Sequence, residues 1–246
     1  MKNYSFDIII PTYNEEKIIQ DSLHKLIDFH KNAAKLYNIN CSIIIVDNGS
    51  TDQTSNIVKK FLKLNPEVKL IEISDKGKGI AVRTGFLYSK AEFVVFSDAD
   101  LASDIMAIPR MLELANNGAD LVYASRFEND SEVSRSITRA IPSYIFLKLA
   151  NIFLSLNISD YNCGLKLYNR KVFLDIFLTL DNYGFFFDTE VIYRASLKKI
   201  NLKPVGVRWV EGEDSKVKVF NLSLNYLRNL INIKKKRRTY LSSSLN

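Results

Sequence analysis

The first half of the chain alternates between short apolar runs and longer segments in which apolar residues recur three and four positions apart. Short β-branched runs are typical of buried strands, and the three-and-four spacing is typical of helices. This pattern predicts strands at residues 7–11, 42–46, 68–73, 93–97 and 121–124. It predicts helices between them, at about 14–35, 50–64, 77–90 and 105–117, the second opened by a capping box at Ser50–Gln53. Such alternation favours an α/β fold with a mostly parallel sheet and helices on both faces.

The pattern changes after Arg126. Residues 128–136 are polar and predict a mobile loop, whereas residues 137–157 are rich in Ile, Leu, Phe and Tyr and are interrupted by Pro142. Further strands are predicted at 165–168 and 202–209, and further helices at 188–199 and 221–233. With no repeat and no linker, we expect one domain over 1–220, including acceptor- and membrane-facing helices at about 134–158. An amphipathic helix and basic tail at 221–246 would follow it.

Composition and charge indicate which partners the protein could bind. The 246 residues are 47% hydrophobic and have a net charge of +7, with five consecutive basic residues at Lys234–Arg238. Such a run indicates an anionic membrane or nucleic acid, or else a solvated tail. Nucleic acid is disfavoured because no surface that combines aromatic and basic residues is evident. Cys41 and Cys163 lack metal-ligand spacing, which favours a reducing, cytosolic compartment. We find neither a signal peptide nor an apolar run near the ~20 residues that cross a bilayer, so we expect no transmembrane segment.

Polar residues follow three of the predicted strands, at Pro11–Glu16, Asp47–Asp52 and Asp98–Asp100. In an open parallel sheet, ligands bind outside the carboxyl ends of the strands, so these segments predict one shared site. Asp98 and Asp100 are two apart and would point to the same side of an extended segment. Paired carboxylates suit Mg²⁺ or Mn²⁺, which commonly share oxygen ligands with substrate phosphates. A solvated, Asp-rich turn is the alternative.

The motifs together resemble a known family. Pro11–Glu16, Val46–Asp52, Lys76–Gly79, Asp98–Leu101 and Ser125-Arg126 are similar, in this order, to the motifs of family 2 glycosyltransferases. Within that family the chain most resembles the dolichyl- or polyprenyl-phosphate hexosyltransferases, in the segments Asp160–Lys166, Gly184–Glu190 and Trp209–Val217. The resemblance spans roughly residues 6–217 and implies a GT-A type fold and a metal-dependent glycosyltransferase. The chain differs from the family pattern at two places. Asn48 stands where the family often has a second Asp, and Tyr161-Asn162 stands where the hexosyltransferases have Thr-Gln.

The resemblance also implies residue roles. The nucleotide's base and ribose would lie among Pro11, Tyr13, Glu15 and Asp47. Lys76 would lie near the donor, and Lys216 would belong to a loop that closes over it. The metal and diphosphate would lie at Asp98 and Asp100. The acceptor phosphate would be held by Arg126, Arg139 and Ser143. Glu190 is a possible donor contact only.

The implied reaction is inverting transfer of a hexose from a nucleotide sugar, UDP-glucose ahead of GDP-mannose, to a polyprenyl or dolichyl phosphate. An acceptor phosphate is already an anion near neutral pH and needs no dedicated base. The apolar segment 141–158 would lie in the membrane interface or else pack in the core. We expect a peripheral protein at the cytoplasmic face of a membrane, attached directly or through a membrane-anchored partner. The alternatives are a sugar or polysaccharide acceptor, which needs a carboxylate base, and a non-catalytic binding module.

Overall fold

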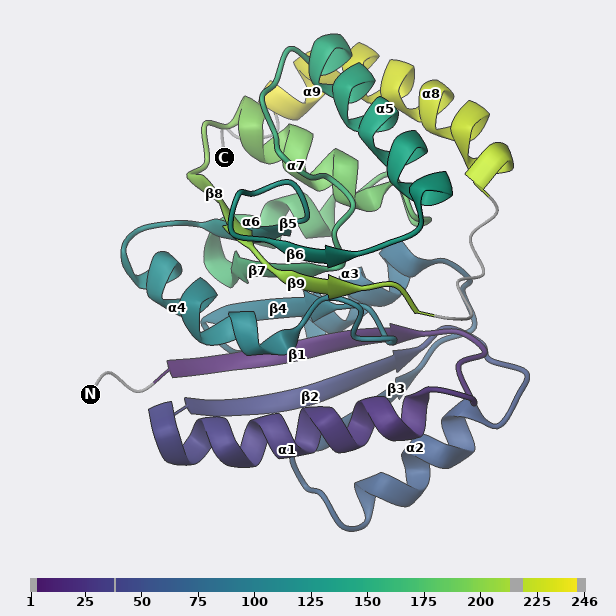
Figure 1. Cartoon of the computed structure of the whole chain (residues 1–246), viewed down its shortest axis with the longest axis vertical. Helices are drawn as coiled ribbons and strands as arrows, with labels where there is room; N and C mark the ends of the chain where they lie inside the picture. Colours follow the sequence, from purple (N-terminus) through teal and green to yellow (C-terminus); the bar gives the residue numbers. More distant parts are fainter. Residues whose placement is uncertain (1–3, 38, 213–218, 243–246) are drawn as a thin grey trace.

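The computed structural model of the chain describes residues 4–37, 39–212 and 219–242. Its centre is a seven-stranded sheet in the order β3-β2-β1-β4-β7-β5-β8 (Figure 1). All neighbouring strands run parallel except β7, which is antiparallel to β4 and β5. The prediction of a mostly parallel sheet is therefore confirmed. The strands are β1 (Tyr4–Thr12), β2 (Ile39–Asp47), β3 (Val68–Glu72), β4 (Phe93–Ser97), β5 (Leu121–Ser125), β7 (Leu165–Asn169) and β8 (Leu202–Gly206).

Helices cover both faces of this sheet because its central strands are apolar on both sides. In β1, Ile8 and Ile10 belong to one buried core and Ile9 to the other. The first core is covered by α1 (Ile19–Tyr37), α2 (Thr54–Leu62) and α4 (Ile108–Asn116), which follows a 3₁₀ turn at Ile105–Ala107. The second is covered by α3 (Lys78–Tyr88), α5 (Ile137–Leu154), α6 (Arg170–Leu178), α7 (Phe187–Leu197), α8 (Val219–Lys235) and α9 (Arg237–Ser242).

The polar stretch that we expected to be a mobile loop contains a strand. β6 (Glu132–Ser134) pairs in parallel with β9 (Arg208–Val210) in a separate two-stranded sheet. The single strand predicted at 202–209 is accordingly divided into β8 and β9. The division lies at Gly206, where an added Cβ would approach Asp130 Oδ1 to 2.0 Å. The loop that carries Asp130 therefore packs closely against the last residue of β8.

The apolar segment after β6 is one continuous helix, α5, and Pro142 does not break it. Only Leu147, Ala150 and Leu154 of this helix are buried. Among the described residues α5 alone is long and apolar enough to span a membrane, with a mean hydropathy of 1.2 over 18 residues. Our statement that no apolar run approaches that length was therefore too strong. Core helices of soluble proteins also reach this length and hydropathy.

The C-terminal helices pack on the domain and do not form a separate tail. Leu230 and Ile233 of α8 and Tyr240 of α9 are buried in the second core, and α8 lies beside α5 in Figure 1. The Tyr240 hydroxyl donates to Asp181 Oδ2 at 2.7 Å. The basic run at 234–238 therefore spans the end of α8, a turn at Lys236 and the start of α9, and buried apolar residues flank it on both sides.

Candidate active site

The loops after β1 and β2 are joined at the carboxyl edge of the sheet, as the sequence predicted. The backbone N–H of Asn14 donates to Ser50 Oγ at 2.9 Å, and Asn14 Oδ1 accepts from the backbone N–H of Thr51 at 2.7 Å. Asn14 has a φ of 55°, a left-handed conformation that asparagine tolerates. Ser50 also donates to the buried carboxylate of Asp47. The capping-box prediction was wrong, because Ser50 serves this loop contact and α2 begins only at Thr54.

The predicted nucleotide-binding residues line this edge. Pro11 is buried at the end of β1, opposite Val46. Tyr13 is exposed, and Lys76 Nζ lies 5.5 Å from its ring centroid and 3.4 Å from its hydroxyl. The backbone N–H of Glu15 donates to Thr54 Oγ1 at 2.7 Å. The structure therefore brings the loops after β1, β2 and β3 together, whereas Lys216 lies outside the described residues.

A row of alternating charges runs from the interior to Asp98. The buried Lys166 Nζ lies 2.7 Å from Asp188 Oδ1, Asp188 Oδ2 lies 3.9 Å from Lys78 Nζ, and Lys78 Nζ lies 2.8 Å from Asp98 Oδ1. Burial opposes the charge of Lys78, but Asp98 and Asp188 outweigh it and raise the pKa of this lysine. Lys78 is therefore a fixed cation at the edge of the site.

Asp98 and Asp100 follow β4 and form the other half of this edge. The backbone N–H of Asp98 donates to Gly164 O at 3.0 Å, and Asp100 Oδ1 accepts from the backbone N–H of Ala102 at 3.1 Å. Enclosure by the surrounding protein and the charge of Asp98 raise the pKa of Asp100. A divalent cation would relieve this repulsion, so the pair fits Mg²⁺ or Mn²⁺. In the described part of the chain no third Asp, Glu, His or Cys joins the two, which leaves positions for donor phosphate oxygens.

The predicted acceptor side begins at Arg126, which is committed to a buried partner. Its Nε lies 2.7 Å from Asp160 Oδ2, its Nη2 lies 2.9 Å from Asp160 Oδ1, and its side chain is only 8% exposed. Burial alone would raise the pKa of Asp160, but the paired Arg126 lowers it. Arg126 therefore lies at the site with its planar fork already occupied.

Arg139 and Ser143 lie one turn apart on α5, as predicted, but they bond to different partners. Arg139 Nη1 donates to Glu211 Oε1 at 2.8 Å, whereas Ser143 Oγ accepts from Arg135 Nη2 at 2.8 Å. An open hollow of about 420 Å³ lies at this end of α5 and is lined by Ser136, Thr138, Arg139, Glu211 and Gly212.

Gly212 joins this hollow to the paired carboxylates. An added Cβ on Gly212 would lie 3.4 Å from Asp100 Oδ2. The backbone N–H of Val210 donates to Ala102 O at 2.9 Å, which fixes β9 beside the segment that follows Asp100. The hollow and the nucleotide-side loops therefore flank the Asp98–Asp100 pair.

Glu190 does not reach the site. It is fully buried, and its carboxylate accepts from the backbone N–H groups of Asp181 at 3.0 Å and Asn182 at 2.8 Å. It also pairs with Arg194 at 3.2 Å. The suggested donor contact was wrong, because every oxygen of this carboxylate is used inside the protein.

Four residues at the site were not singled out in the sequence. Lys78, Lys166 and Asp188 lie within motifs that carried the resemblance, so their neighbours already gave a signal. Arg135 lies in the stretch that we took for a mobile loop, and no sequence pattern marked it.

A mostly parallel sheet with helices on both faces and paired carboxylates at its carboxyl edge is the architecture of a GT-A glycosyltransferase. The chain belongs to glycosyl transferase family 2, whose model, described as "Glycosyl transferase family 2", matches residues 7–177. It is 32% identical to the dolichyl-phosphate beta-glucosyltransferase of Saccharomyces cerevisiae, over 92% of this chain and 73% of that protein. It is 30% identical to the protein of the same name from Dictyostelium discoideum, over 94% of this chain and 74% of that protein.

A solved structure with the same fold is glucosyl-3-phosphoglycerate synthase from Mycobacterium tuberculosis, in complex with Mn²⁺ and uridine-diphosphate-glucose. The TM-score is 0.64 with 17% sequence identity, and the match covers 95% of this chain and 79% of that one. At this identity the likeness establishes the fold.

Proposed function

We propose that the protein transfers glucose from UDP-glucose to a polyprenyl phosphate of the dolichyl type and inverts the anomeric centre. The observation that carries this proposal is the position of the hollow beside Asp100. The hollow has an arginine in its lining and lies at one end of α5, whose remaining length has a largely exposed apolar surface. An acceptor with a phosphate head and a hydrocarbon tail matches both features. The names of the relatives in yeast and Dictyostelium support the same substrate class.

On the donor side, Pro11, Tyr13, Glu15 and Asp47 would bind the base and ribose, with Lys76 beside them. Lys216, which lies outside the described residues, would contact the donor as well. Exposed Tyr13 offers an aromatic face for a base, and the Lys76 ammonium offers charge for the diphosphate. GDP-mannose is the second donor to test.

Asp98 and Asp100 would hold Mg²⁺ or Mn²⁺. When bound, the metal supplies charge that stabilises the departing diphosphate. Lys78 contributes a second, permanent cation next to Asp98, at 2.8 Å. It would favour the nucleoside diphosphate as the bond from the anomeric carbon to the diphosphate oxygen breaks.

On the acceptor side, Arg126, Arg139 and Ser143 would orient the lipid phosphate. One of its oxygens attacks the anomeric carbon from the face opposite the leaving group, which gives a β-linked product from an α-linked donor. Because the phosphate is already ionised, this step needs no proton acceptor. The cations reduce the repulsion between two anionic substrates and keep the reacting atoms aligned.

A sugar hydroxyl acceptor would need a carboxylate base, and Glu211 is the carboxylate that lines the hollow. The backbone N–H of Ser136 donates to it at 2.8 Å, and Arg139 pairs with it at 2.8 Å. These contacts lower the pKa of Glu211 and so weaken it as a base. This favours the phosphate acceptor.

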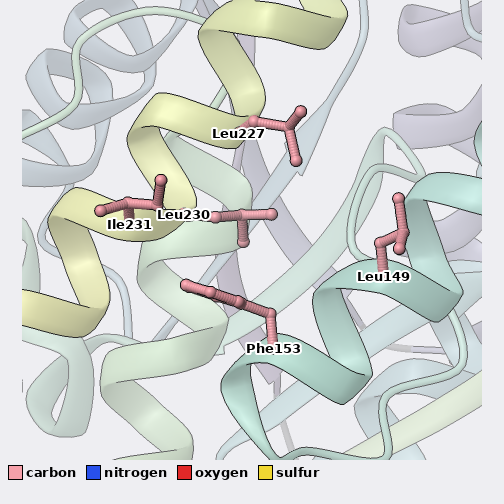
Figure 2. A pocket seen from close by; sticks show the side chains of 5 residues that line it. All are labelled: Leu149, Phe153, Leu227, Leu230 and Ile231. Carbon is pink, nitrogen blue, oxygen red and sulfur yellow. The ribbon is translucent and has the colours of Figure 1, made fainter.

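The protein would contact the membrane through α5 and α8, at the cytoplasmic face. Exposed apolar side chains on these helices include Ile137, Ile141, Ile145, Leu149, Ile152, Leu227 and Ile231. In Figure 2, side chains of both helices surround an apolar pocket of about 130 Å³, lined by Leu149, Phe153, Leu227, Leu230 and Ile231. Lys234 lies over Phe153, with its Nζ 4.3 Å from the ring centroid. Apolar surface bordered by lysines is typical of proteins that lie on anionic bilayers. A membrane-anchored partner could strengthen this attachment.

The test supplies purified protein with dolichyl or undecaprenyl phosphate in detergent, Mg²⁺ or Mn²⁺, and a panel of radiolabelled nucleotide sugars. We expect metal-dependent label in the organic phase from UDP-glucose, lost in Asp100→Ala. Label from GDP-mannose instead would correct the donor. Metal-dependent release of nucleoside diphosphate without lipid label would show that the proposed lipid phosphate is not the acceptor.

A further inference from the structure

Two arginines from different segments lie against one aromatic ring at the acceptor side. The guanidinium carbons of Arg126 and Arg135 lie 5.5 and 5.4 Å from the ring centroid of Trp209. Arg139 follows Arg135 by four residues. Of these three arginines Arg139 lines the hollow, whereas Arg126 and Arg135 meet at Trp209. Their charges act on one another, and like charges this close repel unless anions compensate them.

Two of the three charges are neutralised inside the protein. Arg126 pairs with Asp160 at 2.7 Å, and Arg139 pairs with Glu211 at 2.8 Å. Arg135 differs from both, because no carboxylate of the described residues forms a salt bridge with it. Its Nε is buried and has no hydrogen-bond partner within the described ranges 4–37, 39–212 and 219–242. Partial burial and the nearby charge of Arg126 lower the pKa of Arg135, and the opposing charges of Asp160 and Glu211 only partly offset this.

A partly buried guanidinium without a salt-bridge partner is costly to a folded protein, and such a group commonly marks a ligand site. The side chain is nevertheless held in one place. Its guanidinium carbon lies over the Trp209 ring, 5.4 Å from the centroid, and its Nη2 donates to Ser143 Oγ at 2.8 Å. Its neighbour Ser136 lines the hollow beside Asp100. An anion that entered the hollow would lie next to the segment that carries this guanidinium, because Ser136 follows Arg135 directly.

We propose that Arg135 joins Arg139 and Ser143 in binding the acceptor phosphate. Arg126, whose fork is occupied by Asp160, would orient the phosphate indirectly, as a positioning residue that acts through Asp160 and Trp209. The ligand class is a phosphate monoester, whose two terminal oxygens match the parallel N–H groups of an arginine fork. This assignment rests on the proposed function and adds a residue to its acceptor site. It also gives Trp209 a role, since the indole contacts both guanidinium groups.

The experiment compares wild type with Arg135→Gln and Arg135→Lys, using farnesyl phosphate as a short acceptor and UDP-glucose as donor. We expect Arg135→Gln to raise the acceptor KM about 10- to 100-fold, the range of a charge-assisted hydrogen bond, and to leave the donor KM within about twofold. Arg135→Lys keeps the charge without the fork, so its acceptor KM should lie in between. Arg110→Gln is the matched control, because Arg110 forms an exposed pair with Asp130 away from the hollow.

A purely structural role for Arg135 predicts a different result. Arg135→Gln would then lower Tm and alter both KM values together, and Arg135→Lys would behave in the same way. That result, or an unchanged acceptor KM in an active Arg135→Gln variant, overturns the proposal.

A second readout separates this proposal from the proposed function. Farnesyl phosphate binding is measured by calorimetry without donor, and we expect wild type to bind and Arg135→Gln to lose at least tenfold in affinity. If wild type transfers no glucose but binds farnesyl phosphate through Arg135, the proposed reaction is wrong and the proposed anion site is supported. If Arg135→Gln binds as wild type does, the anion site is wrong whatever the reaction.

Discussion

The ammonium nitrogen of Lys78 lies 2.8 Å from Asp98 Oδ1, so a cation of the protein itself already accompanies one of the two carboxylates at the centre of the site. Asp188 Oδ2 lies 3.9 Å from the same Lys78 nitrogen, and Asp188 Oδ1 pairs with the buried Lys166. The position of Lys78 is therefore set from the interior of the domain, and its charge faces the place proposed for the donor diphosphate.

Replacing Lys78 by methionine should lower kcat about 100-fold, because a fixed positive charge beside the departing diphosphate is lost. The donor KM should change less, since the metal and nucleotide contacts remain. Steady-state kinetics with varied UDP-glucose measure both values. Lys90→Met, at an exposed position after α3, is the control. A Lys78→Met enzyme with more than half the wild-type kcat would rule out this role.

Gly164→Ala should inactivate the enzyme and leave the fold intact. An added Cβ would lie 1.9 Å from Asp98 Oδ2, and the carboxylate, as the movable end of a side chain, would have to rotate away. That rotation breaks the pair with Lys78 and removes one proposed metal ligand. We expect at least 100-fold less activity and weaker Mn²⁺ binding by water-proton relaxation, with an unchanged circular dichroism spectrum. Gly184→Ala is the matched control, because an added Cβ there contacts nothing within 4 Å. Equal activity of the two variants would contradict the prediction.

Asp160→Asn should destabilise the protein by about 3–5 kcal/mol at pH 7, because Arg126 would keep a buried charge without its partner. Urea unfolding measures the difference. Arg126 lowers the pKa of Asp160 in the folded state below the ordinary carboxyl value. The stabilisation is therefore complete above that value and is lost as the pH falls through the folded pKa.

The difference between wild type and Asp160→Asn should accordingly stay constant from pH 8 to about 5 and shrink only below about 4. Asp130→Asn removes an exposed pair with Arg110 and should change stability little. A difference that already disappears near pH 6 would show that Asp160 is not held ionised by Arg126.

Ile145→Glu and Ile152→Glu should each weaken binding to vesicles that contain phosphatidylserine, by about tenfold or more. Both side chains are exposed on α5, Ile152 at 77%, and burying an isoleucine contributes about 1.5–3 kcal/mol. Vesicle co-sedimentation measures binding. Leu64→Glu is the control, since Leu64 is 84% exposed but follows α2 on the other face of the sheet. If all three variants bind alike, α5 is not the membrane-facing element.

Local pattern was sufficient wherever a segment's own residues decide its structure. The run Ile8–Ile10 predicts a strand buried on both faces, and β1 is such a strand. It was insufficient for α6, whose run at 170–178 was not recognised as a helix, and for the polar stretch 128–136, which forms β6 only because β9 lies beside it. A three-residue strand of exposed side chains has too little pattern of its own to be found in a sequence.

The sequence by itself determined the α/β alternation, the family and the Asp98–Asp100 pair, because strand periodicity and closely spaced motifs are local properties of the chain. Only the tertiary structure decided which cations are available at the site. Arg126, Arg135 and Arg139 look alike in the sequence, and their partners Asp160 and Glu211 lie 34 and 72 residues away from Arg126 and Arg139 along the chain. Whether an arginine is neutralised depends on which distant carboxylate the fold brings to it, and residue spacing does not encode that distance.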